Sequence, residues 1–213
     1  DELEFVKKIQ YDEEGPDGVG RFAMQFQVLS DERLYLGSFS NKGIFDLSSN
    51  LLSKYDLQIA ELEGDHNFDG YVEKTLVVTP QDENKLFTIL ISWNDQLSLL
   101  GSIDAQTKKF KNYPIPALDY LSSFKLVYSE GGTPRAMLAD FLDLSRSEDI
   151  LIVSSKVGAD IYTFDFTTEN FIHYPASPIT LPAKKTVKIP QVVESMEEFQ
   201  KHNRSMGQDI NFS

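Results

Sequence analysis

A short block that occurs three times without gaps constrains the fold of this chain more than any other feature. The copies begin at Asp46, Asp104 and Asp165. In each copy an apolar residue precedes the aspartate, and a hydroxyl side chain, an apolar side chain and a tyrosine follow at the same spacing. The repeated tyrosines are Tyr55, Tyr113 and Tyr174. A feature that recurs in this way indicates that the chain is built from similar supersecondary units.

Each block predicts a β-hairpin. The aspartate and the polar residues after it favour a turn, because their side chains hydrogen-bond to nearby backbone groups. Apolar residues then alternate with polar ones, and two copies end at a proline, which stops a strand. The blocks fall in three units, at about residues 22–57, 74–115 and 136–176, each with three or four short strands. We expect every aspartate to cap its own turn rather than to join a ring of functional carboxylates.

The predicted fold class is all-β, with propeller blades of three to four antiparallel strands. A sheet of this size needs neighbours to bury its faces, and radial packing of such sheets makes a β-propeller. Closed propellers have about four to eight blades, so the three units predict a partial propeller with pieces of two more blades. Those pieces are an outer strand at 4–11 and a first strand at 210–213. The third unit is expected to open with one strand over 137–144.

Two segments depart from the strand pattern. A loop and a short helix are expected over 180–206, because Ser195 and Glu198 form a capping box before Phe199. This places the helix at about 195–204. The helical spacing of Leu118, Leu121 and Phe124 predicts a second short helix. The basic cluster Lys184, Lys185 and Lys188 is expected to be a solvated loop rather than a binding patch.

Composition excludes several classes of function. The chain has 33 acidic and 20 basic side chains, for a net charge of −13. Such a surface repels phosphate backbones, so no nucleic-acid partner is expected. The absence of cysteine removes disulfides, thiolate zinc sites and cysteine nucleophiles. No apolar run is long enough for a transmembrane segment. The start at Asp1 is compatible with a leader removed upstream.

Several segments resemble exported propeller lipoproteins of Bacteroides-type bacteria, the family called domain of unknown function 4221. The similar segments are Gly15–Gly20, Leu34–Leu36, Gly43–Asp46, Val193–Phe199 and Ile210–Phe212. The resemblance implies a propeller of about six or seven blades, related in shape to NHL-type and six-bladed propellers. It also implies export to the periplasm or outer membrane, with a lipid anchor on a cysteine upstream of this chain. It implies no known activity.

One loop predicts a calcium site. Asp65, Asn67, Asp69, Tyr71 and Glu73 follow the pattern Asp-x-Asn-x-Asp-Gly-x-x-Glu. Side-chain oxygens at alternate positions, with the Tyr71 carbonyl, can converge on one hard cation. The loop resembles calcium loops of integrin-like propellers, but it is not an EF-hand, because an apolar residue stands where the bidentate glutamate belongs. The alternative is an Asx-turn loop without metal.

No catalytic residues or other cofactors are predicted. The chain has no Gly-rich phosphate loop and no Gly-x-Ser-x-Gly motif, and its three histidines fall in separate segments. The expected function is a non-catalytic module that binds a protein, peptide or glycan. The alternative is a hydrolase or lyase with its site at the central channel, because propellers host both. An acid–base cluster at the channel would favour the enzyme, and an exposed apolar patch would favour binding.

Overall fold

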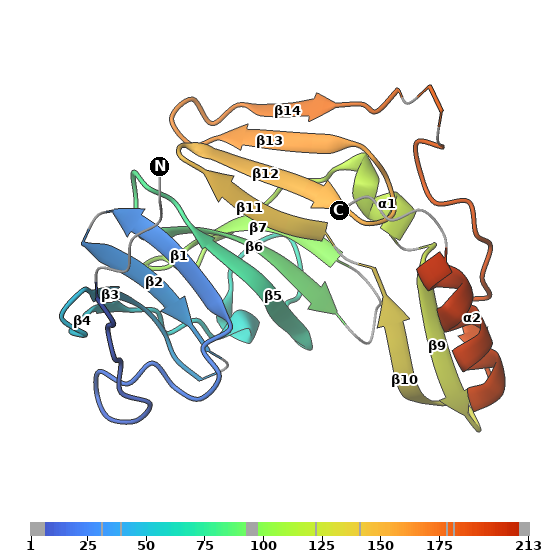
Figure 1. The fold of residues 1–213 in the computed structure, drawn as a ribbon, viewed down its shortest axis with the longest axis horizontal. Coiled ribbons are helices and arrows are strands. Elements are labelled where there is room, and N and C mark those ends of the chain that lie inside the picture. Colours follow the sequence, from blue (N-terminus) through green and yellow to red (C-terminus); the bar gives the residue numbers. More distant parts are fainter. Residues whose placement is uncertain are drawn as a thin grey trace.

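Four small β-sheets make up most of the chain in the computed structural model (Figure 1). The structure describes residues 7–208, apart from positions 31, 39, 93–97, 122, 141, 178 and 181. The first sheet has the order β1 (Gln25–Ser30), β2 (Arg33–Gly37), β3 (Lys42–Asp46), β4 (Leu51–Lys54). The second is β5 (Tyr71–Val78), β6 (Lys85–Ser92), β7 (Ser98–Asp104), β8 (Phe110–Asn112). The third is β11 (Leu142–Ser147), β12 (Ile150–Ser155), β13 (Ile161–Asp165), β14 (Phe171–Tyr174).

The predicted all-β class, with sheets of three to four strands, is confirmed. In the three four-stranded sheets every pairing joins strands that follow one another in the chain and run antiparallel. The three repeated blocks form the last hairpin of each sheet: β3–β4, β7–β8 and β13–β14. The same repeated block therefore forms the last hairpin in each of the three four-stranded sheets.

The repeated aspartates cap their own turns, as predicted. Asp46 Oδ1 accepts backbone hydrogen bonds from Ser48 and Asn50, at 2.7 and 2.9 Å. Asp104 Oδ1 accepts from the backbone of Gln106 and Thr107, and Asp165 Oδ1 from that of Thr167 and Thr168. Hydrogen bonds from Asn50, Thr107 and Thr168 are the main cause of a lowered pKa at the three carboxyl groups.

The second sheet lies between the first and the third, and the apolar residues of β6 show why. Leu86 and Leu90 belong to a buried cluster with Tyr35 and Ile44 of the first sheet. The alternate residues Phe87 and Ile89 point the other way, and Phe87 packs with its ring centroid 4.6 Å from that of Phe164 in the third sheet. A strand covered on both faces needs apolar side chains on both faces, in place of apolar–polar alternation.

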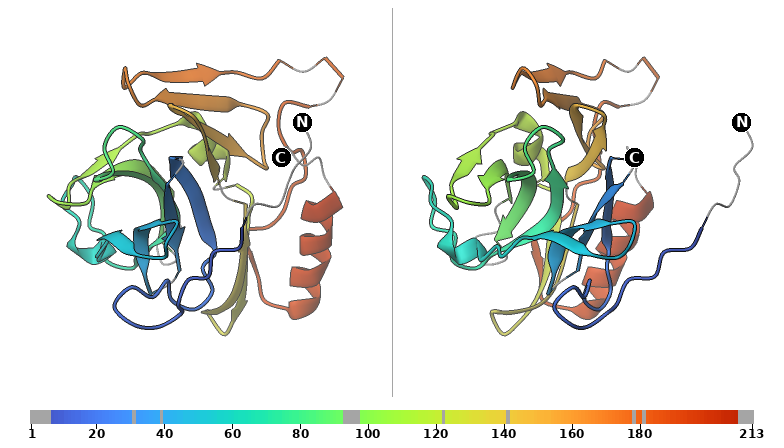
Figure 2. Two further views of the ribbon diagram at one scale, coloured as in Figure 1. Left: turned by 60° about the vertical axis from the view of Figure 1, so that its left-hand side comes forward. Right: turned by 90° about the vertical axis from the view of Figure 1, so that its left-hand side faces the viewer.

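The outer faces of the first and third sheets carry exposed apolar side chains. On the first sheet Met24, Phe26 and Val28 are 65, 62 and 53% exposed, all on one face of the strand. The third sheet exposes Ile150, Ile161, Ile172 and Tyr174. The N-terminal segment runs past the first sheet (Figure 2), and its Tyr11 ring packs edge-on against Phe45 of β3.

A fourth, smaller sheet contains β10 (Thr133–Ala139), β9 (Lys125–Glu130) and β15 (Val192–Val193). Strand β15 runs parallel to β9, and it is the one parallel strand among the sheets of the described residues. The expected single strand over 137–144 is wrong, because it is divided between β10 and β11 of different sheets. At the break, the Asp140 carboxylate lies 2.8 Å from the ammonium of Lys185. The two halves of the expected strand have different partners, because β10 pairs with β9 and β11 pairs with β12.

Helix α2 (Met196–Gln208) packs against β9 through Phe199 and Tyr128, whose ring centroids lie 6.2 Å apart. Its N-terminus has the predicted cap, in which Ser195 Oγ accepts from the Glu198 backbone at 3.1 Å. Helix α1 (Pro116–Leu121) and a single 3₁₀ turn, η1 (Ile59–Glu61), complete the elements. None of the described helices is long and apolar enough to cross a bilayer.

The two expected terminal strands have different outcomes. Residues 210–213 and 4–6 lie outside the described part of the chain. Residues 7–11, which belong to the other expected strand, are not in a strand. Side chains hold this segment instead: Ser49 Oγ donates to the Gln10 carbonyl and the Tyr11 hydroxyl donates to the Asp46 carbonyl.

Candidate functional site

The first strands of the three large sheets, β1, β5 and β11, meet at the centre of the molecule (Figure 1). A side chain from each of these strands forms hydrogen bonds with the backbone of another of the three. Gln27 of β1 donates to the Leu76 carbonyl of β5 at 2.5 Å and accepts from the Val78 amide at 3.0 Å. Because β5 is an edge strand, its backbone groups lack strand partners on this side, and the glutamine amide supplies them.

Two long cationic side chains complete the connections. Lys74 of β5 donates to the Leu142 carbonyl of β11 at 3.4 Å. Arg146 of β11 donates through Nη2 to the Val28 carbonyl of β1. Burial lowers the pKa of both side chains. The three strands are thus linked in a circuit, β1 to β5 to β11 and back to β1.

A cavity of about 650 Å³ lies among these three strands, and we call it the central cavity. Its apolar lining includes Met24, Phe26 and Val28, the exposed row of the first sheet. Its cationic lining is Lys74 and Arg146, and none of the described residues that line it is Asp, Glu or His. In a protein with a net charge of −13, this is a local excess of positive charge.

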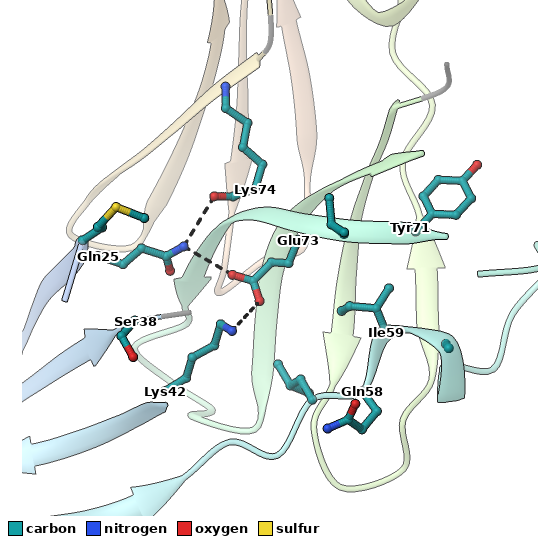
Figure 3. A pocket seen from close by; sticks show the side chains of 13 residues that line it. Gln25, Ser38, Lys42, Gln58, Ile59, Tyr71, Glu73 and Lys74 are labelled. Atoms are coloured by element: carbon teal, nitrogen blue, oxygen red, sulfur yellow. Dashed lines mark hydrogen bonds and ion pairs between the residues drawn. The ribbon is translucent and has the colours of Figure 1, made fainter. Parts of the chain in front are cut away.

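A second cavity of about 450 Å³ lies between the first and second sheets (Figure 3), and we call it the rim cavity. It is lined by the start of β1, the connection from β2 to β3, the segment 57–60 and the start of β5. It shares Met24, Gln25 and Lys74 with the central cavity. The two hollows therefore lie along the same inner strands.

A buried carboxylate, Glu73, is the polar centre of the rim cavity (Figure 3). Its side chain is 6% exposed, and its Oε2 lies 3.5 Å from the Lys42 ammonium. Its Oε1 accepts from the Gln25 amide at 3.3 Å, and that amide also faces the Lys74 carbonyl. Burial raises the pKa of Glu73, and the neighbouring Lys42 and Gln25 offset this only in part. Removing two charges from water is costly, so the buried Glu73–Lys42 ion pair is stable only when both partners are present.

The polar contacts of Glu73 and Gln25 extend into the core of the first sheet. The fully buried Tyr35 hydroxyl donates to Gln25 Oε1 at 3.0 Å. Burial raises the pKa of Tyr35, with a further contribution from the charge of Glu73. A Cβ atom at Gly37 would lie 2.7 Å from the Tyr35 hydroxyl oxygen, so this position requires glycine. Tyr35 thereby fixes the orientation of the Gln25 amide.

The five residues of the predicted calcium loop are divided between different surroundings. The Asn67 side chain accepts from the Asp69 backbone at 3.1 Å, which is an Asx turn, and Asp65 is exposed. Tyr71 packs against Phe68, and Glu73 faces Lys42 and Gln25. Within the described residues no group of three or more Asp, Glu or His side chains could hold a metal. These contacts favour the Asx-turn alternative, and the calcium site stays a prediction.

The family model described as Domain of unknown function (DUF4221) matches residues 1–213. The chain belongs to this family. A solved structure of a DUF4221 family member from Bacteroides vulgatus ATCC 8482 is similar, with 13% sequence identity and a TM-score of 0.48. The similarity covers 84% of this chain and 50% of that one, so the chain spans about half the length of that structure. No curated protein matches the chain.

The histidines and the basic cluster of this DUF4221 chain lie away from the two cavities. His173 contacts Asp160 at 3.1 Å and stacks on Tyr162, in the outer part of the third sheet. Lys185 is not solvated as expected: it is buried and paired with Asp140. The long-range Asp140 contact, which the sequence does not reveal, brings this lysine into the core.

Sequence reasoning missed Gln25, Gln27, Lys42 and Arg146, which make most of the site in this DUF4221 chain. One signal was available for the first two. Gln25 and Gln27 alternate with Met24, Phe26 and Val28, so the strand presents two amides on one face and apolar groups on the other. Lys42 and Arg146 are single basic residues in ordinary strands, and their roles depend on the packing of distant sheets.

Proposed function

We propose that this DUF4221 chain is a non-catalytic binding module whose site lies where β1, β5 and β11 meet. The ligand is a protein, peptide or glycan. One observation carries the proposal: the exposed row Met24, Phe26 and Val28 lines the central cavity, and Met24 also lines the rim cavity. Exposed apolar groups that adjoin hollows with a few fixed polar groups are typical of binding surfaces. The cavity volumes also fall in the range of about 300–1,000 Å³ common for ligand sites.

The alternative function, a hydrolase or lyase at the central channel, rests on Glu73. Its raised pKa is a feature of catalytic acids. Against catalysis, Glu73 is already engaged by Lys42 and Gln25. It is also the only Asp, Glu or His among the described residues that line either cavity. Glycoside hydrolysis and similar chemistry ordinarily need a second acid or base.

The proposal includes a propeller architecture with NHL-like, six-bladed relatives. Support comes from the position of β1, β5 and β11, since the first strand of every large sheet lies at one centre. It also comes from the exposed apolar outer face of the third sheet, which a further blade would cover. The module is proposed to be exported and lipid-anchored, in the periplasm or at the outer membrane. Support for that location is the family resemblance.

A binding screen tests the function directly. The wild-type protein, Phe26→Ser and Ile172→Ser are applied to one glycan array and one peptide array. We expect a set of ligands that wild type and Ile172→Ser retain and that Phe26→Ser loses, because Ile172 is an exposed apolar residue on the far sheet. Equal retention by Phe26→Ser would place binding elsewhere. Release of cleaved products from the arrays would favour the hydrolase or lyase.

A further inference from the structure

We propose that the central cavity binds a monocarboxylate carried on an apolar body, namely the C-terminus of an apolar peptide. This inference rests on the binding function proposed above and narrows its ligand. It combines three observations: the charge of the cavity lining, the buried and unpaired Nη1 of the Arg146 guanidinium, and the apolar row beside it.

The charge of the lining selects an anion. Lys74 and Arg146 line the cavity, and the described lining contains no Asp or Glu. Three carboxylates lie in the surroundings: Asp140 and Asp143 act on Lys74, and Asp149 acts on Arg146. Asp149 accepts a hydrogen bond from Gln81, and Asp140 is paired with Lys185. Asp149 and Asp140 are therefore engaged elsewhere, and Asp143 is exposed, so none of the three acids lines the cavity and its lining is positively charged.

Arg146 supplies the specific donor. Its Nη2 is bonded to the Val28 carbonyl, whereas its Nη1 is shielded from solvent and has no hydrogen-bond partner. A buried guanidinium nitrogen without an acceptor has lost its hydrogen bonds to water and has formed no hydrogen bond within the protein in their place. A carboxylate oxygen would satisfy it, because guanidinium and carboxylate groups match in shape and charge. Arg146 lines the central cavity, so a carboxylate bound there would lie beside this guanidinium.

The apolar row selects the rest of the ligand. Met24, Phe26 and Val28 line the same cavity as Arg146, and Leu144 of β11 lines it from the opposite strand. A ligand that covered the row would remove this apolar surface from water, which is favourable in proportion to its area. A free phosphate or a sugar would leave the row exposed. An apolar carboxylate uses both parts of the cavity.

Hexanoate and its neutral isostere hexanamide test the inference by isothermal titration at low salt. We expect wild type to bind hexanoate at least about tenfold more tightly than hexanamide, as a charge-assisted hydrogen bond predicts. Arg146→Gln removes the guanidinium and its charge, and it should lose that preference. Arg33→Gln is the matched control, because Arg33 pairs with Glu83 on the surface. It should bind as wild type does.

A second variant keeps the result interpretable if Arg146→Gln does not fold. Phe26→Ser retains the guanidinium and should weaken hexanoate and hexanamide alike. Equal affinity of wild type for the two probes, or no binding of either, would overturn the inference. If the arrays still identify ligands that depend on Phe26, the binding function stands and only the carboxylate assignment fails. If hexanoate binds equally well to wild type and to both variants, its site is elsewhere.

Discussion

The outer turns and the inner strands of the same sheets are stabilised in different ways. In each outer turn, an aspartate accepts hydrogen bonds from residues that follow it within the same hairpin. At the inner strands, Gln27 and Arg146 bond to backbone groups of other sheets, 49 and 118 residues away in sequence. The outer contacts are repeated, whereas the inner contacts differ from one sheet to the next.

This difference assigns a structural role to the outer turns and leaves specificity to the contacts of the inner strands. A repeated local turn gives each sheet the same end, and it carries no information that distinguishes one sheet from another. The inner contacts depend on which sheets are neighbours, so each side chain there can differ. Binding sites are commonly built in this manner, from varied residues positioned by a regular scaffold.

The largest expected effect comes from breaking the buried pair at the inner rim. Lys42→Met leaves the Glu73 carboxylate without its cation and should lower the free energy of unfolding by about 3 kcal/mol at pH 7. The pKa of Glu73 is raised in the folded protein. The stability linked to this group is therefore present at acid pH and lost as pH rises through its folded pKa. Urea unfolding at pH 5 and pH 7 should show a smaller deficit at pH 5.

The double variant Lys42→Met/Glu73→Gln is the control for that prediction. It removes the charge along with its partner, so the pH dependence of the deficit should disappear. A deficit in Lys42→Met that is the same at both pH values would mean that the ammonium does not compensate Glu73.

Gln27→Leu should have the next largest effect. It removes both hydrogen bonds to the edge of β5 and leaves the Leu76 carbonyl and the Val78 amide without these partners. An expected cost of about 2 kcal/mol follows from two unsatisfied backbone groups, at about 1 kcal/mol each because they lie beside a cavity that water can enter. Gln106→Leu, at the exposed outer turn of the second sheet, is the matched control and should change stability by less than about 0.5 kcal/mol. Equal effects at the two positions would contradict the distinction between inner and outer contacts.

A smaller effect is expected at an outer turn. Asp104→Ala removes the acceptor for the Gln106 and Thr107 amides. Because the site is exposed, water can replace the lost acceptor, and thermal unfolding should show a loss of no more than about 1 kcal/mol. Asp104→Asn keeps the side-chain oxygen and should recover most of the loss. A loss as large as that of Gln27→Leu would show that the outer turn is more than a local cap.

The smallest expected effect concerns the predicted calcium loop. Asn67 already accepts the Asp69 amide, and Glu73 already faces Lys42. We therefore expect the same melting temperature in millimolar calcium and in chelator. A calcium-dependent rise that disappears in Asp69→Ala would instead support the metal site, by the linkage between ligand binding and stability.

Local chemistry explains which parts of this structure could be predicted from sequence. The repeated aspartates, the hairpins and the capped helix α2 depend on residues close together in the chain, so the pattern predicts them. The break between β10 and β11 depends on pairing with strands of two different sheets, and no local turn signal marks it.

The candidate site shows a second limit of prediction from sequence. Glu73 was singled out, but for a metal, because the spacing of oxygen-bearing residues fits a calcium loop. Its partner Lys42 comes from a strand of a different sheet, and their distance of 3.5 Å is set by how the first and second sheets pack. Sequence spacing identified a polar residue of interest, and tertiary packing determined its surroundings.

The most direct test of the proposed central site is a map of amide chemical shifts during titration with hexanoate. The account predicts that the largest changes fall on residues 25–28, 74–77 and 144–146, which line the central cavity. The outer turns at Asp46, Asp104 and Asp165 should not change. Changes confined to the outer turns, or spread evenly over the protein, would contradict the claim that the inner strands form the binding site.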